Sequence, residues 1–224
     1  IATCWLVFAM ASRLLFLVGQ QGIVTYQLGG WSTPWGIEYR VDGLSALLLL
    51  IVSGMGAVVI TYAPTSVDRE IPKEQQTLFY TLYLLCLTGL LGIIITGDLF
   101  NLFVFLEISS LSSYALISLG RHRRALVASL QYLVMGTIGA TFILIGIGLA
   151  YQITGSLNMA DLAALLTQYT GDRTNNRTVL VAFAFLSVGI SLKMAVFPLH
   201  QWLPNAYTFA PSVVTAFLAA TSTK

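Results

Sequence analysis

The stretch GDLFNLFVFLEISSLSSYALISL, residues 97–119, has the length and apolar character of a helix that crosses a membrane. At ~1.5 Å rise per residue, about twenty residues span a hydrocarbon core of ~30 Å. The middle of this stretch holds one carboxylate, Glu107, between Leu106 and Ile108. A charge at the centre of a bilayer costs roughly 2.5–3.5 kcal/mol on insertion scales, so a carboxylate there requires an explanation.

Two explanations for Glu107 are open from the sequence. It can be a structural residue that hydrogen-bonds to a neighbouring helix, or it can be a proton or cation site. Helical spacing places Phe100, Phe103, Ser110 and Tyr114 on roughly the same face. Since two of these four side chains are polar, we expect this face to look into a helix bundle.

The composition predicts an all-α polytopic integral membrane protein. The chain has 224 residues, of which 57% are hydrophobic and only 9% are charged, whereas soluble domains carry about 25% charged residues. The short alternating segments of a transmembrane barrel do not occur in the sequence, and a net charge of +2 gives no sign of a nucleic-acid partner. Cys4 and Cys86 lie in apolar runs without metal-ligand spacing, which indicates core thiols.

Hydropathy predicts about six complete membrane spans and the start of a seventh. The expected spans are residues 2–24, 43–62, 77–96, 97–119, 126–152 and 178–197, and the last one opens at Pro211. Apolar sequence begins at once and continues to the last residue. We therefore expect residues 1–224 to form a single transmembrane domain, an internal piece of a longer chain.

The connections between these spans are also predicted from the residues. We expect an aromatic connection at residues 26–42 that ends in an N-cap at Asp42, a charged loop at 63–76 and a tight turn at 97–98. We also expect a basic loop at 120–124, a short amphipathic helix at 158–166 and a polar connection at 199–210. Small residues let helices approach closely, as expected for Gly136, Gly139, Gly146 and Gly148.

Positive charge is distributed unevenly between alternate loops. One set holds Arg69, Lys73, Arg121, Arg123 and Arg124, and the other holds Arg40, Arg173 and Arg177. Because positively charged loops stay in the cytoplasm, we expect the 121–124 loop to be cytoplasmic in a bacterial-type inner membrane.

Lys193 is a second charge at membrane depth, and Pro198 follows it by five residues. A proline removes one backbone hydrogen bond and clashes with the carbonyl four residues earlier, so we expect a broken helix near residues 193–198. Non-helical backbone at this depth is tolerated only inside protein or beside a water-filled cavity. The alternative is a lysine that snorkels from a helix end to the interface.

Lys224 and His200 complete the candidate set. Lys224 is either a buried relay residue or an interfacial lysine, and His200, just past the break, is either a relay residue or a plain hydrogen-bonding residue. Burial disfavours the charged forms of Lys and Glu, and a nearby opposite charge restores both. A Glu107–Lys193 pair on separate helices would therefore act as a protonation switch.

Two motifs make the chain resemble a known superfamily. TGDLFNLFVFLEISSLSSYALIS (residues 96–118) resembles the fifth transmembrane helix of antiporter-like subunits, and SLKMAVFPLHQWLPNAYTFAPS (residues 191–212) resembles their seventh helix and the following loop. The stretch at residues 136–163 fits as well. The resemblance is closest to the D-type subunits of Mrp-type multisubunit monovalent cation/proton antiporters, and it extends to the proton-pumping membrane subunits of complex I and to membrane-bound hydrogenases.

The resemblance implies a fold with two inverted repeats, of which this chain would hold mostly the first. It also implies roles: Glu107 matches the family's helix-five glutamate, Lys193 the broken-helix lysine, and Lys224 the helix-eight residue that links two half-channels. Some members carry Asp-Ala-His where this chain has Asn205-Ala206-Tyr207, a departure that favours the Mrp-type branch.

Three functions remain open at this point. The first is a proton-translocating membrane subunit of a monovalent cation (Na⁺)/proton antiporter complex, and the second is an antiporter-like subunit of an NADH:quinone oxidoreductase or membrane-bound hydrogenase. The third is a structural membrane subunit. We expect a transporter subunit rather than an enzyme, with no cofactor and no metal, since the sequence has no nucleotide loop, cysteine cluster or haem motif. Its expected partners are other membrane subunits, protons, monovalent cations and the lipid bilayer.

Overall fold

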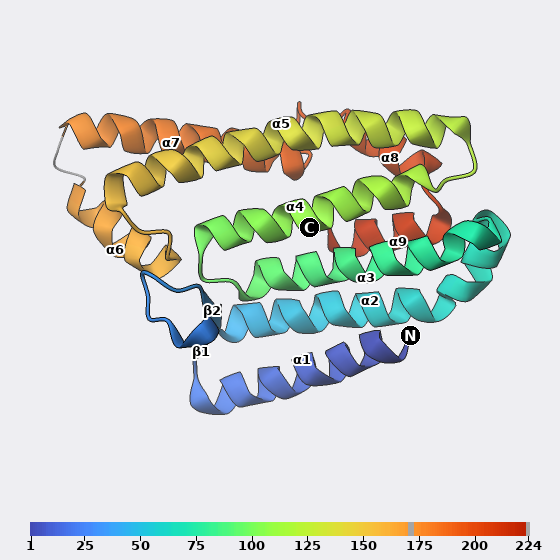
Figure 1. Cartoon of the computed structure of the whole chain (residues 1–224), viewed down its shortest axis with the longest axis horizontal. Coiled ribbons are helices and arrows are strands. Elements are labelled where there is room, and N and C mark those ends of the chain that lie inside the picture. The colour runs from blue at the N-terminus through green and yellow to red at the C-terminus, as the bar shows by residue number, and fades with distance from the viewer. Residues whose placement is uncertain (170–172, 223–224) are drawn as a thin grey trace.

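The computed structural model describes residues 1–169 and 173–222, which form a bundle of long helices and one small sheet (Figure 1). Strands β1 (Val24–Gln27) and β2 (Glu38–Val41) pair antiparallel, with a short 3-10 turn, η1 (Leu28–Gly30), between them. The helices are α1 (Ala2–Gln21), α2 (Gly43–Glu70), α3 (Lys73–Ile95), α4 (Leu99–Ser118), α5 (Arg123–Thr154), α6 (Met159–Tyr169), α7 (Arg173–Lys193), α8 (Trp202–Phe209) and α9 (Ser212–Thr221).

The long helices confirm the prediction of an all-α polytopic membrane protein. Within the described residues, the helices α1 to α5 are long and apolar enough to cross a membrane, by length and composition. The sixth predicted span corresponds to α7, which has 21 residues and therefore a length of about 30 Å. The seventh begins as α9, directly after Pro211.

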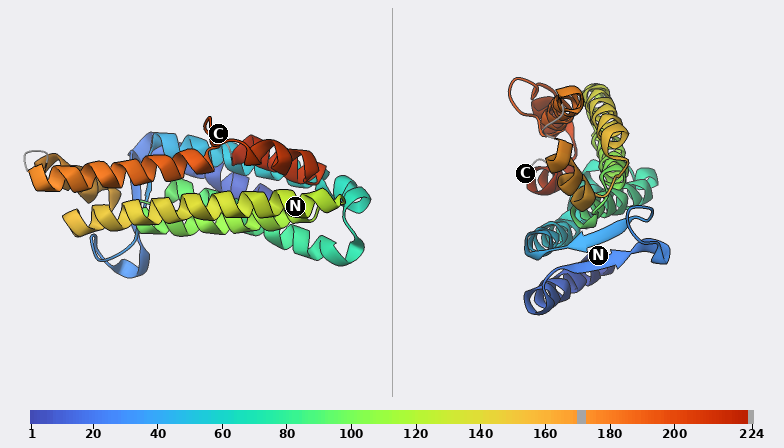
Figure 2. Two further views of the ribbon diagram at one scale, coloured as in Figure 1. Left: turned by 90° about the horizontal axis from the view of Figure 1, so that it is seen from above. Right: turned by 90° about the vertical axis from the view of Figure 1, so that its left-hand side faces the viewer.

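The helices follow one another side by side through the bundle. Helices α1 to α4 form a consecutive row, α5 packs on α4, and α7 packs along α5 (Figures 1 and 2). Helix α9 returns to pack against α2 and contacts α4, so residues far apart in the sequence close the centre of the bundle.

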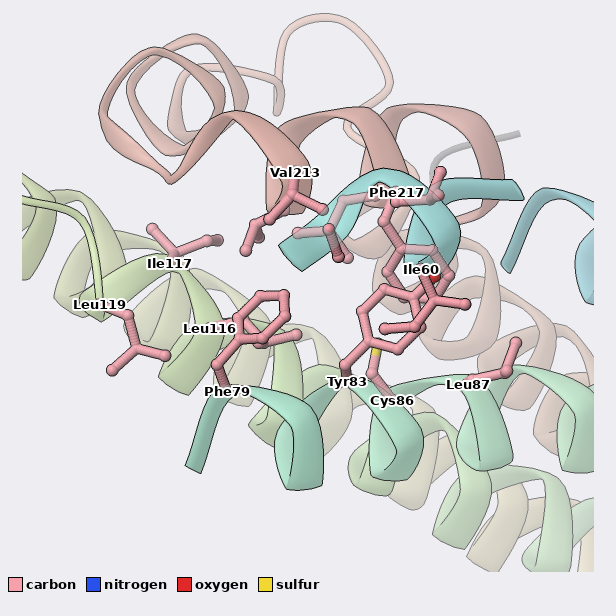
Figure 3. Packing of buried hydrophobic residues seen from close by; sticks show 14 of the residues in the cluster. Ile60, Phe79, Tyr83, Cys86, Leu87, Leu116, Ile117, Leu119, Val213 and Phe217 are labelled. Atoms are coloured by element: carbon pink, nitrogen blue, oxygen red, sulfur yellow. The ribbon is translucent and has the colours of Figure 1, made fainter. Parts of the chain in front are cut away.

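The main apolar core lies where α9 meets α3 and α4. Phe79, Tyr83 and Cys86 from α3 meet Leu116 from α4 and Phe217 from α9 (Figure 3). The rings of Tyr83 and Phe217 lie 4.4 Å apart, and the buried Tyr83 hydroxyl donates to the Gly56 carbonyl at 2.7 Å. Cys86 and Cys4 are both free and buried, as the sequence indicated.

Two predicted loops are partly helical, and these predictions were wrong. The charged segment 63–76 is shared between α2, which ends at Glu70, and α3, which begins at Lys73. The Ser66 hydroxyl donates to Glu70, and Gln76 donates to Asp68 across the turn, so polar side chains stabilise both helix ends. The polar connection 199–210 contains α8, where Pro204 lies in the first turn, a position that tolerates proline.

Three connections contact one another at the end of the bundle that holds the small sheet: the β-hairpin, the α3–α4 turn and the segment that leads into α6. Isolated bridges join Tyr39 to Thr96 and Asp98 to Asn158, and the Asn158 side-chain amide donates to Glu38 at 3.1 Å. The tight 97–98 turn and the short helix after residue 158 are confirmed. The small sheet was not predicted.

Helix caps fix the starts of two spans at this same end. Asp42 accepts from the Ser45 N–H at 2.8 Å, which confirms the predicted cap, and this hydrogen bond lowers the pKa of Asp42. Asp98 caps α4 by accepting from the Asn101 N–H at 2.7 Å. These caps fix where α4, which carries Glu107, begins.

Candidate functional site

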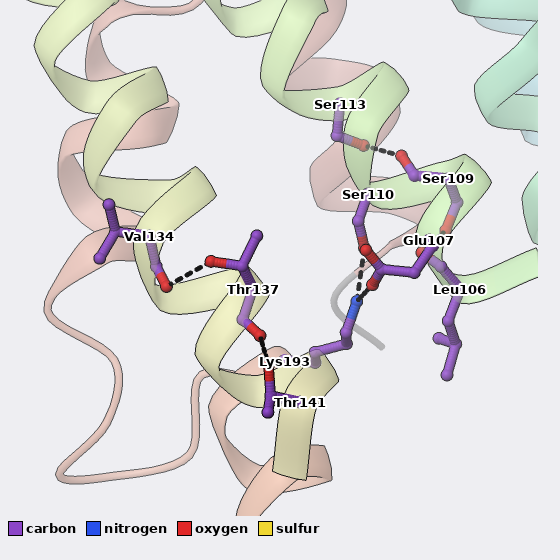
Figure 4. Close-up of polar contacts among 9 residues, drawn as sticks. All are labelled: Leu106, Glu107, Ser109, Ser110, Ser113, Val134, Thr137, Thr141 and Lys193. Atoms are coloured by element: carbon purple, nitrogen blue, oxygen red, sulfur yellow. Dashed lines mark hydrogen bonds and ion pairs between the residues drawn. The ribbon is translucent and has the colours of Figure 1, made fainter. Parts of the chain in front are cut away.

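Glu107 and Lys193 form an ion pair between α4 and α7. The Lys193 Nζ atom lies 2.8 Å from a Glu107 carboxylate oxygen, and the Lys193 and Glu107 side chains are 12% and 23% exposed, respectively. The ammonium also donates to the Ser110 hydroxyl oxygen at 2.8 Å (Figure 4). Ser110 and Tyr114 lie on the helix face predicted for Glu107 and are buried in the bundle as expected, whereas Phe100, at the start of that face, is exposed.

Lys193 holds its position because α7 ends there. Ala195, two residues later, has φ of 53°, the left-handed region that an L-residue other than glycine rarely adopts. The Val196 N–H donates to the Ser191 carbonyl, five residues earlier, instead of following the α-helical pattern. The predicted break is therefore confirmed, and α7 ends five residues before Pro198.

A tryptophan satisfies the backbone at the break. The Trp202 indole N–H donates to the Leu192 carbonyl at 3.2 Å, and this carbonyl belongs to the residue just before Lys193. The same carbonyl also accepts from the Ala195 N–H at 3.3 Å, so the indole adds a second hydrogen bond there. Helix α8 thus holds the broken end of α7 in a defined place.

Three aromatic rings connect this anchor to the ion-pair helix. Trp202 stacks on Tyr132 of α5 at 4.0 Å and 4°, and Tyr132 meets Tyr114 of α4 edge-on at 4.5 Å. The sequence pointed to Tyr114 through its spacing from Glu107. It gave no signal for Trp202, because residues 199–210 were expected to be a connection, and none for Tyr132, which is one of several aromatic residues within a predicted span.

Glycines bring α5 and α7 close enough to position Lys193. A Cβ on Gly189 would lie 2.7 Å from the Gly139 carbonyl oxygen, and one on Gly139 would lie 3.6 Å from Lys193 Cγ. Gly136 makes room for the Tyr114 hydroxyl, and Gly146 contacts Leu186 and the Ala182 carbonyl. The predicted close approach is confirmed at these positions but was wrong for Gly148, which faces open space.

Of the remaining candidates, the structure describes His200, for which no direct contact with the ion pair is found among the described residues. His200 lies between α7 and α8, its ring is 5.6 Å from Phe197, and its buried Nδ1 atom has no hydrogen-bond partner in the described part of the chain. Lys224 lies outside the described residues. Phe100 and Phe103 pack on each other at 6.1 Å near the start of α4.

The part of the chain that the structure describes contains no cluster of metal-ligating side chains. No group of three or more His, Cys, Asp or Glu side chains is placed there to hold a metal ion. The site offers instead an ammonium, a carboxylate and a hydroxyl within hydrogen-bonding distance.

Residues 96–224 match a family described as NADH:quinone oxidoreductase/Mrp antiporter, transmembrane. These residues include both members of the ion pair and the break in α7. The chain belongs to this family. The match confirms the predicted resemblance to antiporter-like subunits.

Relatives of this family member come from both branches. The NADH-quinone oxidoreductase N subunit of Desulforudis audaxviator is 49% identical over 199 residues, which are 89% of this chain and 38% of that protein. The Na⁺/H⁺ antiporter D subunit of Bacillus subtilis is 36% identical over 211 residues, 94% of this chain and 41% of that protein. The chain thus spans about two fifths of the length of these two relatives.

A solved structure shows the same fold. One chain of the membrane-bound sulfane sulfur reductase, an archaeal respiratory membrane complex, superposes with a TM-score of 0.89 at 34% identity, covering 99% of this chain and 44% of that one. The antiporter-like fold predicted from the two motifs is therefore confirmed.

Proposed function

We propose that this chain is part of a proton-translocating membrane subunit of a monovalent cation (Na⁺)/proton antiporter complex. The observation that carries the proposal is the 2.8 Å ion pair between Glu107 and Lys193, held at a helix break within the bundle. Similarity to the D subunit of a Na⁺/H⁺ antiporter supports the antiporter branch.

Glu107 and Lys193 act in this proposal as a switchable pair. While they are in contact, the carboxylate stabilises the ammonium form and Ser110 accepts a second hydrogen bond. When they separate, desolvation disfavours both charges and the lysine can release its proton. Such a separation requires only rotation of the Lys193 side chain, because α7 ends at this residue and the chain after it is no longer helical.

His200 and Lys224 are the further members of the relay in this proposal. His200 would accept protons near the break, which fits a buried ring nitrogen that has no partner in the described residues. Lys224 would pass the proton onward, a role that rests on the resemblance of the 191–224 segment alone.

The family relationship supports the wider setting of the proposal. We infer that residues 1–224 form a single transmembrane domain, mostly the first of two inverted repeats, in a multi-pass protein of the cell membrane. Other membrane subunits of a hetero-oligomeric complex are its expected partners, and the 121–124 loop is assigned to the cytoplasm from its charge.

A redox-driven proton pump is a second candidate function. The 49% identity to an NADH-quinone oxidoreductase N subunit favours it, because this identity is higher than the 36% to the antiporter protein. Purification of the full-length protein with its partners distinguishes the antiporter from the redox-driven pump. Flavin and iron–sulfur absorbance in the purified complex would support the redox branch, whereas sodium-dependent proton flux without such cofactors would support the antiporter.

Replacement of Glu107 by Gln tests the proton-site role in either branch. Glutamine keeps the shape and hydrogen-bonding capacity of the side chain but carries no charge, so we expect coupled proton flux in vesicles to be abolished while the complex still assembles. A conservative control is Glu38→Gln, which removes a carboxylate at the hairpin end of the bundle. Near-normal flux in Glu107→Gln would leave only the structural role of this residue.

A further inference from the structure

A cavity lies at the end of the bundle that carries the basic loop. It has a volume of about 570 Å³ and lies between the α2–α3 and α4–α5 connections. Lys73, Arg121 and Arg123 line it together with one carboxylate, Asp68, and with His122. Three permanent cations and a single anion give this cavity a net positive charge.

No described carboxylate lies within ion-pair distance of these three cations, although the Arg121 guanidinium interacts electrostatically with Glu70, which lies outside the lining. The single ion pair found in the described ranges 1–169 and 173–222 is that of Glu107 with Lys193. Asp68 instead accepts a hydrogen bond from the Gln76 amide at 3.0 Å. Lys73, Arg121 and Arg123 are all exposed, so their charges are available to a ligand.

Backbone donors add to the side chains. The cavity includes the starts of α3 and α5, whose N-cap residues, Pro72 and His122, make no side-chain capping hydrogen bond. The ends of α2 and α4 lie at the same place, so the helix dipoles largely offset one another. The positive field therefore comes from the three side chains, while free N–H groups supply directional donors for an oxyanion.

One wall of the cavity is apolar and continues onto the outer face of the bundle. Ile71 and Leu119 are buried in the lining, and Leu126 of α5 lines the cavity while 58% exposed. Val127, the next residue of α5, is also exposed. An apolar wall of this kind can receive acyl chains, so the cavity joins three cations to an apolar surface.

We propose that this cavity binds the phosphate group of an anionic phospholipid. Arg121, Arg123 and Lys73 contact the phosphate oxygens, and the lipid's first acyl segments run along Leu126. A zwitterionic headgroup brings its own cation into a site that already holds three, whereas an anionic headgroup does not. A soluble phosphate ion satisfies the same donors but makes no use of the apolar wall.

The test compares lipid retention by the full-length protein purified in its complex. The complex is placed in nanodiscs of phosphatidylcholine and phosphatidylglycerol, and the bound lipids are identified by native mass spectrometry. Arg121→Gln/Arg123→Gln is compared with Arg69→Gln/Arg124→Gln. The control removes the same charge at the same end of the bundle, but neither of its residues lines this cavity, and Arg124 packs over the Phe209 ring at 5.9 Å.

We expect the native complex to retain phosphatidylglycerol in preference to phosphatidylcholine. The preference of the cavity variant should fall by about 10- to 30-fold, because each cation near a membrane surface contributes about one order of magnitude or less to the affinity for an anionic lipid. The control variant should keep the preference. If the double variant does not assemble, the single variants Arg121→Gln and Arg123→Gln are each expected to lose it several-fold.

Three results would overturn the proposal. Equal loss in both double variants would assign the preference to general surface charge, and retention of the preference in the cavity variant would remove the site. Displacement of phosphatidylglycerol by millimolar inorganic phosphate would show that the cavity takes a soluble anion.

Discussion

Substitution of Lys193 tests whether the ion pair is a relay or only a structural contact. Lys193 makes two charge-assisted hydrogen bonds, both at 2.8 Å, one to Glu107 and one to Ser110. Lys193→Ala removes both and leaves the Glu107 carboxylate without its counter-ion. Breaking a fully buried ion pair by deleting one partner costs about 3–5 kcal/mol. Because these side chains are 12% and 23% exposed, we expect a smaller loss, about 2–3 kcal/mol in the free energy of unfolding.

A double-mutant cycle isolates the interaction itself. Contacting charges show coupling energies of about 0.5–3 kcal/mol. For this partly buried pair we expect about 2 kcal/mol, close to a 30-fold change in the unfolding equilibrium constant. Glu107→Gln combined with Lys193→Ala should therefore be less destabilising than the sum of the two single variants. The matched cycle of Lys193→Ala with Glu38→Gln should be additive, since Glu38 lies in the hairpin and bonds Asn158.

Arginine at position 193 separates charge from proton transfer. Arg keeps the cation and its hydrogen-bond donors but does not deprotonate in proteins. We expect Lys193→Arg to retain most of the stability while proton flux across a range of pH is lost. Full flux in Lys193→Arg, or strict additivity in the Glu107 cycle, would refute the relay and leave Lys193 as a packing residue.

Two further predictions concern topology and packing. A His122→Cys variant should resist a membrane-impermeant thiol reagent added outside intact cells, whereas Ser32→Cys in the hairpin should react. The reverse labelling pattern would show the opposite orientation. The native Cys4 and Cys86 do not interfere, because both are buried. Gly189→Ala should lower the free energy of unfolding by about 1–3 kcal/mol, because its Cβ would meet the Gly139 carbonyl at 2.7 Å. Gly148→Ala, with nothing within 4 Å, should be neutral or slightly stabilising; equal effects in the two variants would show that the close approach of α5 and α7 is not what Gly189 provides.

The sequence predicted the spans and the two charged residues for different reasons. Hydropathy identifies spans because about twenty apolar residues are needed to cross the bilayer. Glu107 and Lys193 stood out because charge is costly at that depth. Both signals are local, so each could be read from a single segment.

The pairing of Glu107 with Lys193 was not accessible in the same way. It depends on the separation of α4 and α7, which is set by the packing of α5 between them through Gly139 and Gly189. The sequence indicated that glycines allow helices to approach closely, but the predicted set of contact glycines also included Gly148, which faces open space. Which face of α5 meets α7 is a property of the assembled bundle.

The boundaries that failed lie outside the predicted spans. Beyond the hydrocarbon core, charged residues are compatible with both helix and loop, and hydropathy no longer distinguishes the two. Helix α2 therefore runs on to Glu70 through residues that looked like a solvated loop. Helix α8 was missed for a different reason, because it has only eight residues and contains Pro204, and with it the sequence concealed the indole that bonds the backbone at the break.

The anchoring of the break has a consequence for how the ion pair can move. Trp202 fixes the Leu192 carbonyl at 3.2 Å and stacks on Tyr132, so the end of α7 is held at its backbone. Lys193 follows directly, and beyond it the chain leaves the helix at Ala195. The lysine side chain is thus attached to a fixed backbone position but is followed by non-helical residues. A change in its contact with Glu107 therefore requires rotation of the flexible lysine side chain rather than displacement of α7. Under the proposed function, this arrangement would let the lysine change its partner within a bundle whose helices keep their packing.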